Sequence, residues 1–180
     1  VRRQRQMCIR DRGKIAMREI VSKPLDRESF RPYGDFVDLL HIKQMDAMAG
    51  ADNIFIPDLT TLRLDERMQA SVCVARVSQC ERIITAVEYH GFTSEGILPL
   101  DGDIDIFVGP SSFQVNPASI EAFRVPKGTF VRLNPGVLHG RQFVVDSQSV
   151  NVMILLPERT FGNDCVFTRL AESDQIKILL

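Results

Sequence analysis

The 180-residue chain lacks a large excess of charge of either sign, and it lacks any long hydrophobic run. Its 22 Lys and Arg residues nearly balance its 23 Asp and Glu residues, so the formal net charge is -1. A nucleic-acid or membrane-surface partner favours a strongly basic chain, and the sequence therefore predicts neither. The longest apolar stretch, Val152 to Leu156, is far shorter than the roughly 20 residues that a membrane-spanning helix needs. The hydrophobic share of 44% is ordinary, so one globular domain with a proper core is expected.

The first residues differ from the remainder of the chain. VRRQRQMCIRDR carries five Arg and one Asp and shows no apolar periodicity. It also lacks the apolar stretch of a secretory signal and the Ser-rich character of a transit peptide. We therefore expect residues 1–16 to be a non-native or disordered extension, with the natural start at Met17 and a single domain over residues 17–180.

Cysteine is scarce, and its spacing matches no metal site. Outside the extension the chain has Cys73, Cys80 and Cys165. An odd number of cysteines without a signal peptide favours reduced thiols and a cytoplasmic location. The alternating pattern around Cys73 predicts a small core residue, and a redox pair of Cys73 with Cys80 is the alternative.

A period of two dominates the chain, and no alternation of strands with helices interrupts it. Strands are predicted over residues 18–22, 36–40, 70–77, 82–89, 104–108, 122–125, 129–133, 142–145, 150–156 and 166–170. Short strands at intervals of about ten residues are typical of a sandwich or barrel. A helical turn capped by Asp26 and a short helix or excursion over His41 to Gly50 complete the expectation of an all-β fold.

Three side chains that can bind a metal or a proton lie close together in one segment. Glu88 and His90 stand two apart on a predicted strand and so project to the same face. The turn at Gly91 allows Glu95 to return to the same cavity. A solvated outer position remains the alternative for Glu88, and a loop cap remains the alternative for Glu95. For His41, by contrast, an ordinary polar role is the expectation.

A second histidine segment follows some forty residues later. There Pro135-Gly136 makes a tight turn that presents His139. The pair of segments, H-x4-E and P-G-x-x-H, resembles the two-part metal motif of the cupins, which are double-stranded β-helix barrels. Two imidazoles and one carboxylate suit a divalent transition metal such as Ni, Zn, Mn or Fe. Glu88 stands where that motif usually has its first His, and so could be a ligand or a catalytic base. The phosphate-cradling, nucleophile-elbow and nucleotide-fold glycine patterns are absent.

Nearly all of residues 17–180 resembles the ureidoglycolate lyase family, a cupin group. Its opening is similar to Pro24-Leu25 with Phe30-Arg-Pro-Tyr-Gly-Asp35, and its central block is similar to Glu88 through Leu100. Its later blocks are similar to Ala122-Phe123, Gly128 with Gly136-Val-Leu-His139, and Asn163-Asp-Cys165. The chain departs from the family where Glu95 replaces Gln, Leu138 replaces Trp and Gly140 replaces a second His.

The resemblance implies an enzyme that cleaves ureidoglycolate to glyoxylate and urea in purine and allantoin breakdown. A metal on His90, Glu95 and His139 would chelate the carboxylate and hydroxyl of the substrate, and Glu88 would take the hydroxyl proton. Lys127 or Arg132 would hold the carboxylate, although surface pairing is the alternative for Arg132. Tyr89 and Asn134 are further candidate substrate-binding residues.

Other readings of the same cavity remain open. One is a non-catalytic cupin that binds a small acid or sugar, and another is a metal-dependent sugar-acid isomerase or oxygenase. The resemblance also implies a homodimer, because cupin barrels have open sheet edges that need covering.

Overall fold

The computed structural model describes residues 17–41, 48–50, 53–64, 66–112 and 114–180. The predicted extension over residues 1–16 lies outside them and stays a prediction. Within the described residues no helix is long and apolar enough to span a membrane. The strands are β1 (Arg18–Pro24), β2 (Gly34–Asp38), β3 (Met48–Gly50), β4 (Asn53–Phe55), β5 (Ala70–Ser78), β6 (Ile83–Ile84), β7 (Ala86–Tyr89), β8 (Glu95–Pro99), β9 (Ile104–Val108), β10 (Glu121–Val125), β11 (Thr129–Leu133), β12 (Phe143–Val144), β13 (Ser149–Pro157), β14 (Val166–Arg169) and β15 (Ile176–Leu179). The helices are α1 (Arg27–Phe30) and α2 (Thr160–Asn163), with 3-10 turns at Pro117–Ser119 and Glu172–Asp174.

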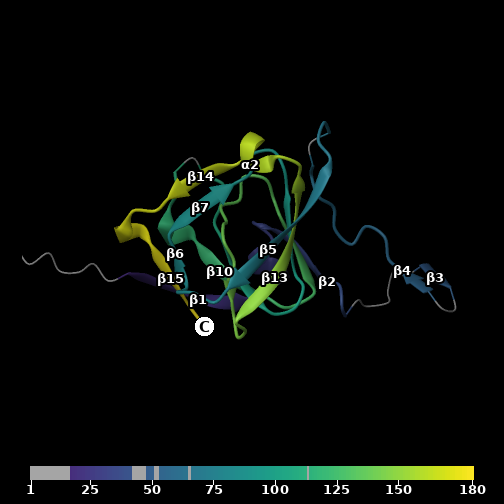
Figure 1. Cartoon of the computed structure of the whole chain (residues 1–180), viewed down its shortest axis with the longest axis horizontal. Helices are drawn as coiled ribbons and strands as arrows, with labels where there is room; N and C mark the ends of the chain where they lie inside the picture. Colours follow the sequence, from purple (N-terminus) through teal and green to yellow (C-terminus); the bar gives the residue numbers. More distant parts are fainter. Residues whose placement is uncertain (1–16, 42–47, 51–52, 65, 113) are drawn as a thin grey trace, which may run out of the picture.

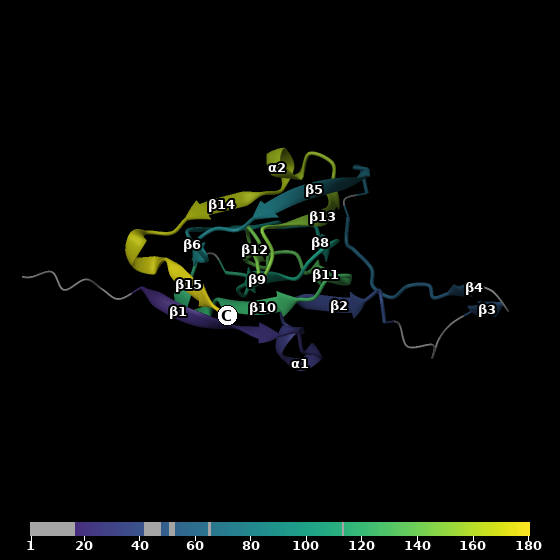
Figure 2. The ribbon, with the colours of Figure 1, turned by 60° about the horizontal axis from the view of Figure 1, so that its bottom comes forward.

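Two sheets curl toward each other and enclose the core (Figures 1 and 2). One has the order β2-β11-β8-β13-β5, and the other has the order β12-β9-β10-β1-β15-β6. All pairs are antiparallel except those of β1, which runs parallel to β10 and β15. β7 and β14 form a further two-stranded sheet. The hairpin of β3 and β4 lies apart from the barrel in both views.

Hydrophobic side chains fill the space between the sheets and also cover the outside of one of them. Along β13 every second residue from Val150 to Leu156 is buried and faces the interior. In β9, Ile106 and Val108 point into this inner cluster, whereas Phe107 points into an outer cluster formed with β15 and β6. The central strands are therefore covered on both faces. This close packing makes the barrel wall rigid where it carries the functional residues.

The first helix begins where the sequence predicted it. Asp26 accepts hydrogen bonds from the backbone N–H groups of Glu28 and Ser29, both at 3.0 Å. The turn delivers Phe30 into the inner cluster, where its ring meets that of Phe123 edge-on at 5.2 Å. This helical cap is confirmed.

Of the two expectations for residues 41–50, a short helix or an excursion, the structure corrects the helix. Met48–Gly50 is strand β3, paired with Phe55 through Asn53 in a hairpin, and residues 42–47 lie outside the described part. The helical spacing of Met and Ala was a weak signal, and cross-strand pairing decides the conformation instead. The predicted strand over 82–89 is two strands, because the chain leaves the β15 partner at Thr85 and pairs with β14.

The prediction of a buried Cys73 is wrong. Cys73 is exposed, and its neighbours Val72 and Val74 are 70% and 69% exposed. The strand β5 lies at the edge of its sheet and pairs only with β13, so this end of β5 is uncovered. Cys73, Cys80 and Cys165 are all free thiols, which agrees with the expectation of reduced cysteine.

Candidate active site

The two histidine segments are joined backbone to backbone. Glu88, near the end of β7, exchanges two hydrogen bonds with His139, at 2.7 and 2.9 Å. The N–H of Gly136 donates to the carbonyl of His90 at 2.6 Å. Gly136 has a φ of +81°, and a Cβ there would meet the Ser111 hydroxyl at 2.5 Å, so the turn requires glycine. These bonds bring His90 and His139 together from distant parts of the sequence.

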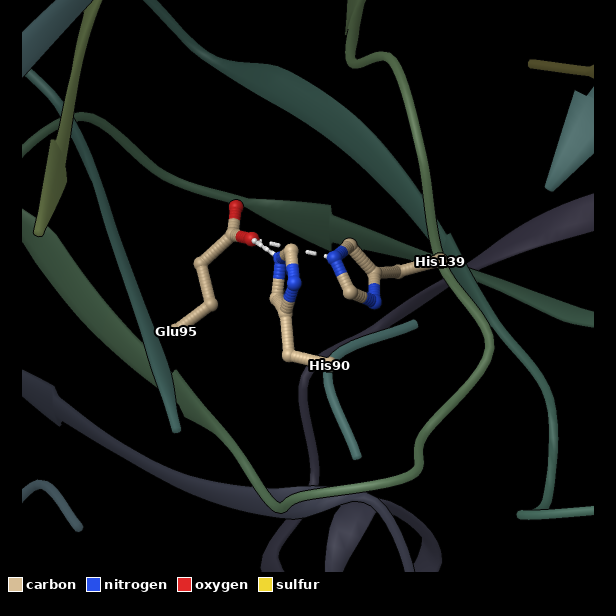
Figure 3. Close-up of side chains that lie close together, drawn as sticks. All are labelled: His90, Glu95 and His139. Atoms are coloured by element: carbon tan, nitrogen blue, oxygen red, sulfur yellow. Dashed lines mark hydrogen bonds and ion pairs between the residues drawn. The ribbon is translucent and has the colours of Figure 1, made fainter. Parts of the chain in front are cut away.

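Three buried side chains meet at one oxygen atom. His90 Nε2 lies 2.9 Å and His139 Nε2 lies 3.0 Å from Oε2 of Glu95 (Figure 3). The three residues are at most 5% exposed, and the imidazole centroids are 5.1 Å apart. Glu95 opens β8 opposite Leu133 of β11, whose side chain belongs to the inner cluster, so the carboxylate points into the barrel.

Backbone carbonyls fix the tautomer of both imidazoles. His90 Nδ1 donates to the carbonyl of Asp164 at 2.7 Å, and His139 Nδ1 donates to that of Val137 at 2.8 Å. In a neutral imidazole the other ring nitrogen then carries a lone pair. Both Nε2 lone pairs are thus aimed at an ionised carboxylate oxygen and repel it. A positive charge between the three atoms is needed to offset this repulsion.

A proton supplies part of that charge. Burial disfavours the charged form of His139, but attraction and hydrogen bonding to Glu95 outweigh it and raise the pKa of His139 above its ordinary 6.5. Burial likewise works against the Glu95 carboxylate, yet His139 and His90 lower the pKa of Glu95 to about 2. Two protons would be needed to satisfy both contacts, which would place two imidazolium rings side by side.

A single divalent cation satisfies all three atoms at once. Two imidazole nitrogens and a carboxylate oxygen, with their ligand atoms within 4.8 Å of one another, form a donor set typical of first-row transition metals. Carbonyl bonds to the remote ring nitrogens are the usual support of metal-binding histidines. The residues present therefore fit a metal ion.

A cavity of about 680 Å³ opens beside this cluster, and both Glu88 and Glu95 line it. The thiol of Cys165 donates to Oε2 of Glu88 at 3.5 Å. Burial and the neighbouring Glu88 raise the pKa of Cys165 to about 11, so the thiol keeps its proton at neutral pH. Apolar side chains complete the wall, with Phe161 and Phe167 exposed at its rim.

The other predicted substrate-binding residues do not line this cavity. Arg132 pairs with Gly96 in the ladder next to the Leu133–Glu95 pair, so its side chain lies on the opposite face of the sheet from Glu95. There it donates to the side chain of Asn134. Lys127 is exposed in the turn before β11, and Tyr89 packs against the outer cluster.

Three cavity or supporting residues were missed by sequence reasoning. Asp164 accepts His90 Nδ1–H through its carbonyl, and Arg141 and Gln142 line the cavity just after His139. Arg141 and Gln142 carry no motif, and only their position next to His139 could have drawn attention to them. Gly140, between them and His139, is required by space, because a Cβ there would meet the ring of Phe107 at 2.8 Å.

Two facing sheets closed into a barrel, with histidines and a carboxylate gathered inside it, define a cupin. The chain belongs to the ureidoglycolate lyase family, whose model matches residues 17–177. It is 27% identical over 126 residues to a ureidoglycolate lyase of Rhodobacter capsulatus, covering 69% of this chain and 78% of that protein. A relative from Agrobacterium fabrum with the same family name is 25% identical over 132 residues, 69% of this chain and 75% of the relative. The resemblance predicted from the sequence is confirmed.

Solved structures include similar folds at low identity. A dTDP sugar isomerase of Desulfovibrio desulfuricans has a TM-score of 0.44 and 13% identity, over 78% of this chain and 83% of that chain. A mutant of Bacillus subtilis oxalate decarboxylase has a TM-score of 0.41 and 11% identity, over 57% of this chain. The matched part is about a quarter of the length of that decarboxylase, 24%.

Proposed function

We propose that this protein is a ureidoglycolate lyase, which cleaves the C–N bond of ureidoglycolate and releases glyoxylate and urea. The observation that carries the proposal is the convergence of His90, Glu95 and His139 at the wall of a cavity that also holds the Glu88 carboxylate. Membership of the family and two relatives with this name support it.

The reaction needs one proton to move from oxygen to nitrogen. The substrate carries a hydroxyl, a carboxylate and the urea nitrogen on one carbon. Glu88 takes the hydroxyl proton, the C–O bond becomes a carbonyl, and the electron pair of the C–N bond leaves with nitrogen. Glu88 then returns the proton to that nitrogen, so that urea departs neutral and the carboxylate is regenerated.

His90, Glu95 and His139 are the residues that would hold a divalent metal. When bound, the ion supplies Lewis-acid polarisation of the substrate oxygen. The role of the chain is to keep both Nε2 atoms free by holding the Nδ1 protons on the carbonyls of Asp164 and Val137.

The test is elemental analysis of the purified protein, followed by an assay of glyoxylate release from ureidoglycolate. We expect about one equivalent of metal per chain and turnover that His139→Ala abolishes. His41→Ala is the matched control, because His41 is exposed and bonded to Asp38. A wild-type protein that binds metal without cleaving ureidoglycolate would contradict the proposal.

A homodimer and a cytoplasmic location remain our expectations for this enzyme. The uncovered edge of β5, with its exposed valines, is one surface that a second subunit would cover. Light scattering should then give twice the chain mass of 20.3 kDa.

A further inference from the structure

The side chain of Gln142 is turned into the catalytic cavity. It is only 7% exposed, and it lines the same cavity as Glu88 and Glu95. It follows the parity of Val144, whose side chain belongs to the inner cluster. Its amide nitrogen makes one long contact, 3.5 Å to the carbonyl of Gly140, and its amide oxygen has no hydrogen bond to any described residue.

The free amide oxygen must therefore face the cavity. Among the described residues every fully buried side-chain nitrogen or oxygen has a hydrogen-bond partner. A buried carboxamide that makes one long contact and lines the cavity has an N–H donor and its acceptor oxygen left for a bound molecule. A buried polar group without a hydrogen-bond partner destabilises the protein. A ligand that forms the missing hydrogen bond removes this penalty and so binds more tightly.

Arg141, the preceding residue, is exposed and brings a cation to the rim of the same cavity, beside Phe143 of the outer cluster. Its guanidinium lies 5.5 Å from the centroid of the Phe143 ring, and it has no ion pair or hydrogen bond to any described residue. Other arginines nearby are engaged. Arg82 and Arg124 both bind the buried Asp105, whereas Arg76 on the opposite wall bonds to a serine hydroxyl.

We infer that Arg141 and Gln142 bind the two ends of the substrate, Arg141 its carboxylate and Gln142 its ureido group. The inference rests on the proposed function and adds its specificity determinants. A guanidinium pairs with a carboxylate through two parallel N–H donors. A ureido group offers N–H donors and a carbonyl, which match the acceptor and the donors of a carboxamide.

A cation beside the metal cluster also favours an anionic substrate in this cavity. Glu88 and Glu95 both line the cavity, and an anionic substrate approaching two carboxylates is repelled unless positive charge receives it. Lys127 and Arg132, the cations that the sequence suggested, lie outside the lining. Arg141 fills that role from the segment that directly follows His139.

Each product of the reaction carries only one of the two groups that Arg141 and Gln142 would bind, so the products test the two contacts one at a time. Glyoxylate carries the carboxylate without a ureido group, and urea carries the ureido functions without a carboxylate. We expect both to inhibit the metal-loaded wild-type enzyme, with urea used well below denaturing concentrations.

Arg141→Ala should raise the KM for ureidoglycolate by about 10- to 100-fold, which is the range of a charge-assisted hydrogen bond. It should also lose inhibition by glyoxylate and keep inhibition by urea.

Gln142→Met should show the opposite pattern, with inhibition by urea lost and inhibition by glyoxylate kept. Gln142→Glu provides a second variant of the same shape should the methionine disturb folding. Arg31→Ala and Gln148→Met are the matched controls, because both side chains are exposed and neither lines the cavity. Equal loss of both inhibitions in either variant, or loss of neither, would overturn the inference.

Failure of the proposed function gives a different result. If the wild-type protein does not cleave ureidoglycolate, the same ligands are tested by the shift that each causes in the melting temperature. A shift by glyoxylate that Arg141→Ala removes, with a shift by urea that Gln142→Met removes, supports the assignment of the two contacts without turnover. Absence of both shifts in the wild type would reject it.

Discussion

The Nε2 atoms of His90 and His139 both lie within hydrogen-bond distance of one oxygen of Glu95. This shared oxygen couples the ionisation of the three residues. The lowered pKa of Glu95 and the raised pKa of His139 describe one interaction seen from its two partners. The sequence predicted which residues would meet, from strand parity and two turns. It could not predict that Glu95 would be the centre, because that depends on the carbonyls that orient both rings.

This coupling predicts how the stability of the metal-free protein depends on pH. The raised pKa of His139 contributes stability that is fully present below its ordinary value of 6.5 and is lost as pH rises through the folded value. The lowered pKa of Glu95 contributes stability that is present above its ordinary 4.5 and is lost as pH falls toward about 2. Thermal melts of chelator-treated protein should therefore show the largest contribution between pH 4.5 and 6.5.

His139→Ala should remove the decline on the alkaline side of that window, since the group that loses its proton is gone. His41→Ala should leave the profile unchanged. An alkaline decline of equal size in the His139 variant would mean that another group is responsible.

Glu88 lies beside the cluster without contacting the shared oxygen, and this position predicts a base and not a ligand. Glu88→Gln should therefore keep the bound metal and lower kcat by about 100- to 10,000-fold, the usual contribution of general base catalysis. The measurement is the metal content of the purified variant beside its rate of glyoxylate release. A variant that loses its metal would instead make Glu88 a ligand.

Most strands were predictable from alternation, whereas β8, β15 and the short strands β3 and β4 were missed. β8 is buried on both faces, with Glu95, Gly96 and Ile97 all inaccessible, so it has no period of two. β15 is a four-residue strand whose partner β1 lies at the other end of the chain. The alternation IKIL of β15 is too short to stand out by itself, so tertiary pairing decides both β8 and β15.

The segment between α2 and β14 fixes the loop that carries His90. The Asp164 carboxylate accepts hydrogen bonds from the backbone N–H groups of Gly91, Phe92 and Thr93, and from the Thr93 hydroxyl at 2.8 Å. Its own carbonyl holds Nδ1 of His90. The short strand pair of β7 and β14 thus acts with Asp164 to orient a ring of the site.

Asp164→Ala should accordingly destabilise the fold and weaken metal binding together. Removing a charged acceptor of several hydrogen bonds costs about 2 kcal/mol, measured as the free energy of unfolding in denaturant. Asp164→Asn, which keeps one acceptor oxygen, should recover part of both effects. Asp146→Ala, an exposed aspartate, serves as the control. Unchanged metal affinity in Asp164→Ala would separate Asp164 from the orientation of His90.

The site joins parts of the barrel that are distant in the sequence. His90 follows β7, Glu95 opens β8 in the five-stranded sheet, and His139 follows the turn after β11. Unfolding must separate all three, so a cation held by them binds the folded chain and not the unfolded one. Such a ligand raises the stability of the whole domain by mass action.

The last prediction follows from that linkage. Metal at 100 times its dissociation constant should stabilise the chelator-treated protein by about 2.7 kcal/mol. For a domain of this size the melting temperature should rise by roughly 5–10 °C. Scanning calorimetry with Ni, Zn, Mn and Fe(II) in turn would identify the ion that the site prefers. His139→Ala should lose the shift and His41→Ala should retain it, because only the former removes a ligand. An equal shift in both variants would place the binding site elsewhere, and no shift with any of the four ions would show that a proton, not a metal, balances the Glu95 carboxylate.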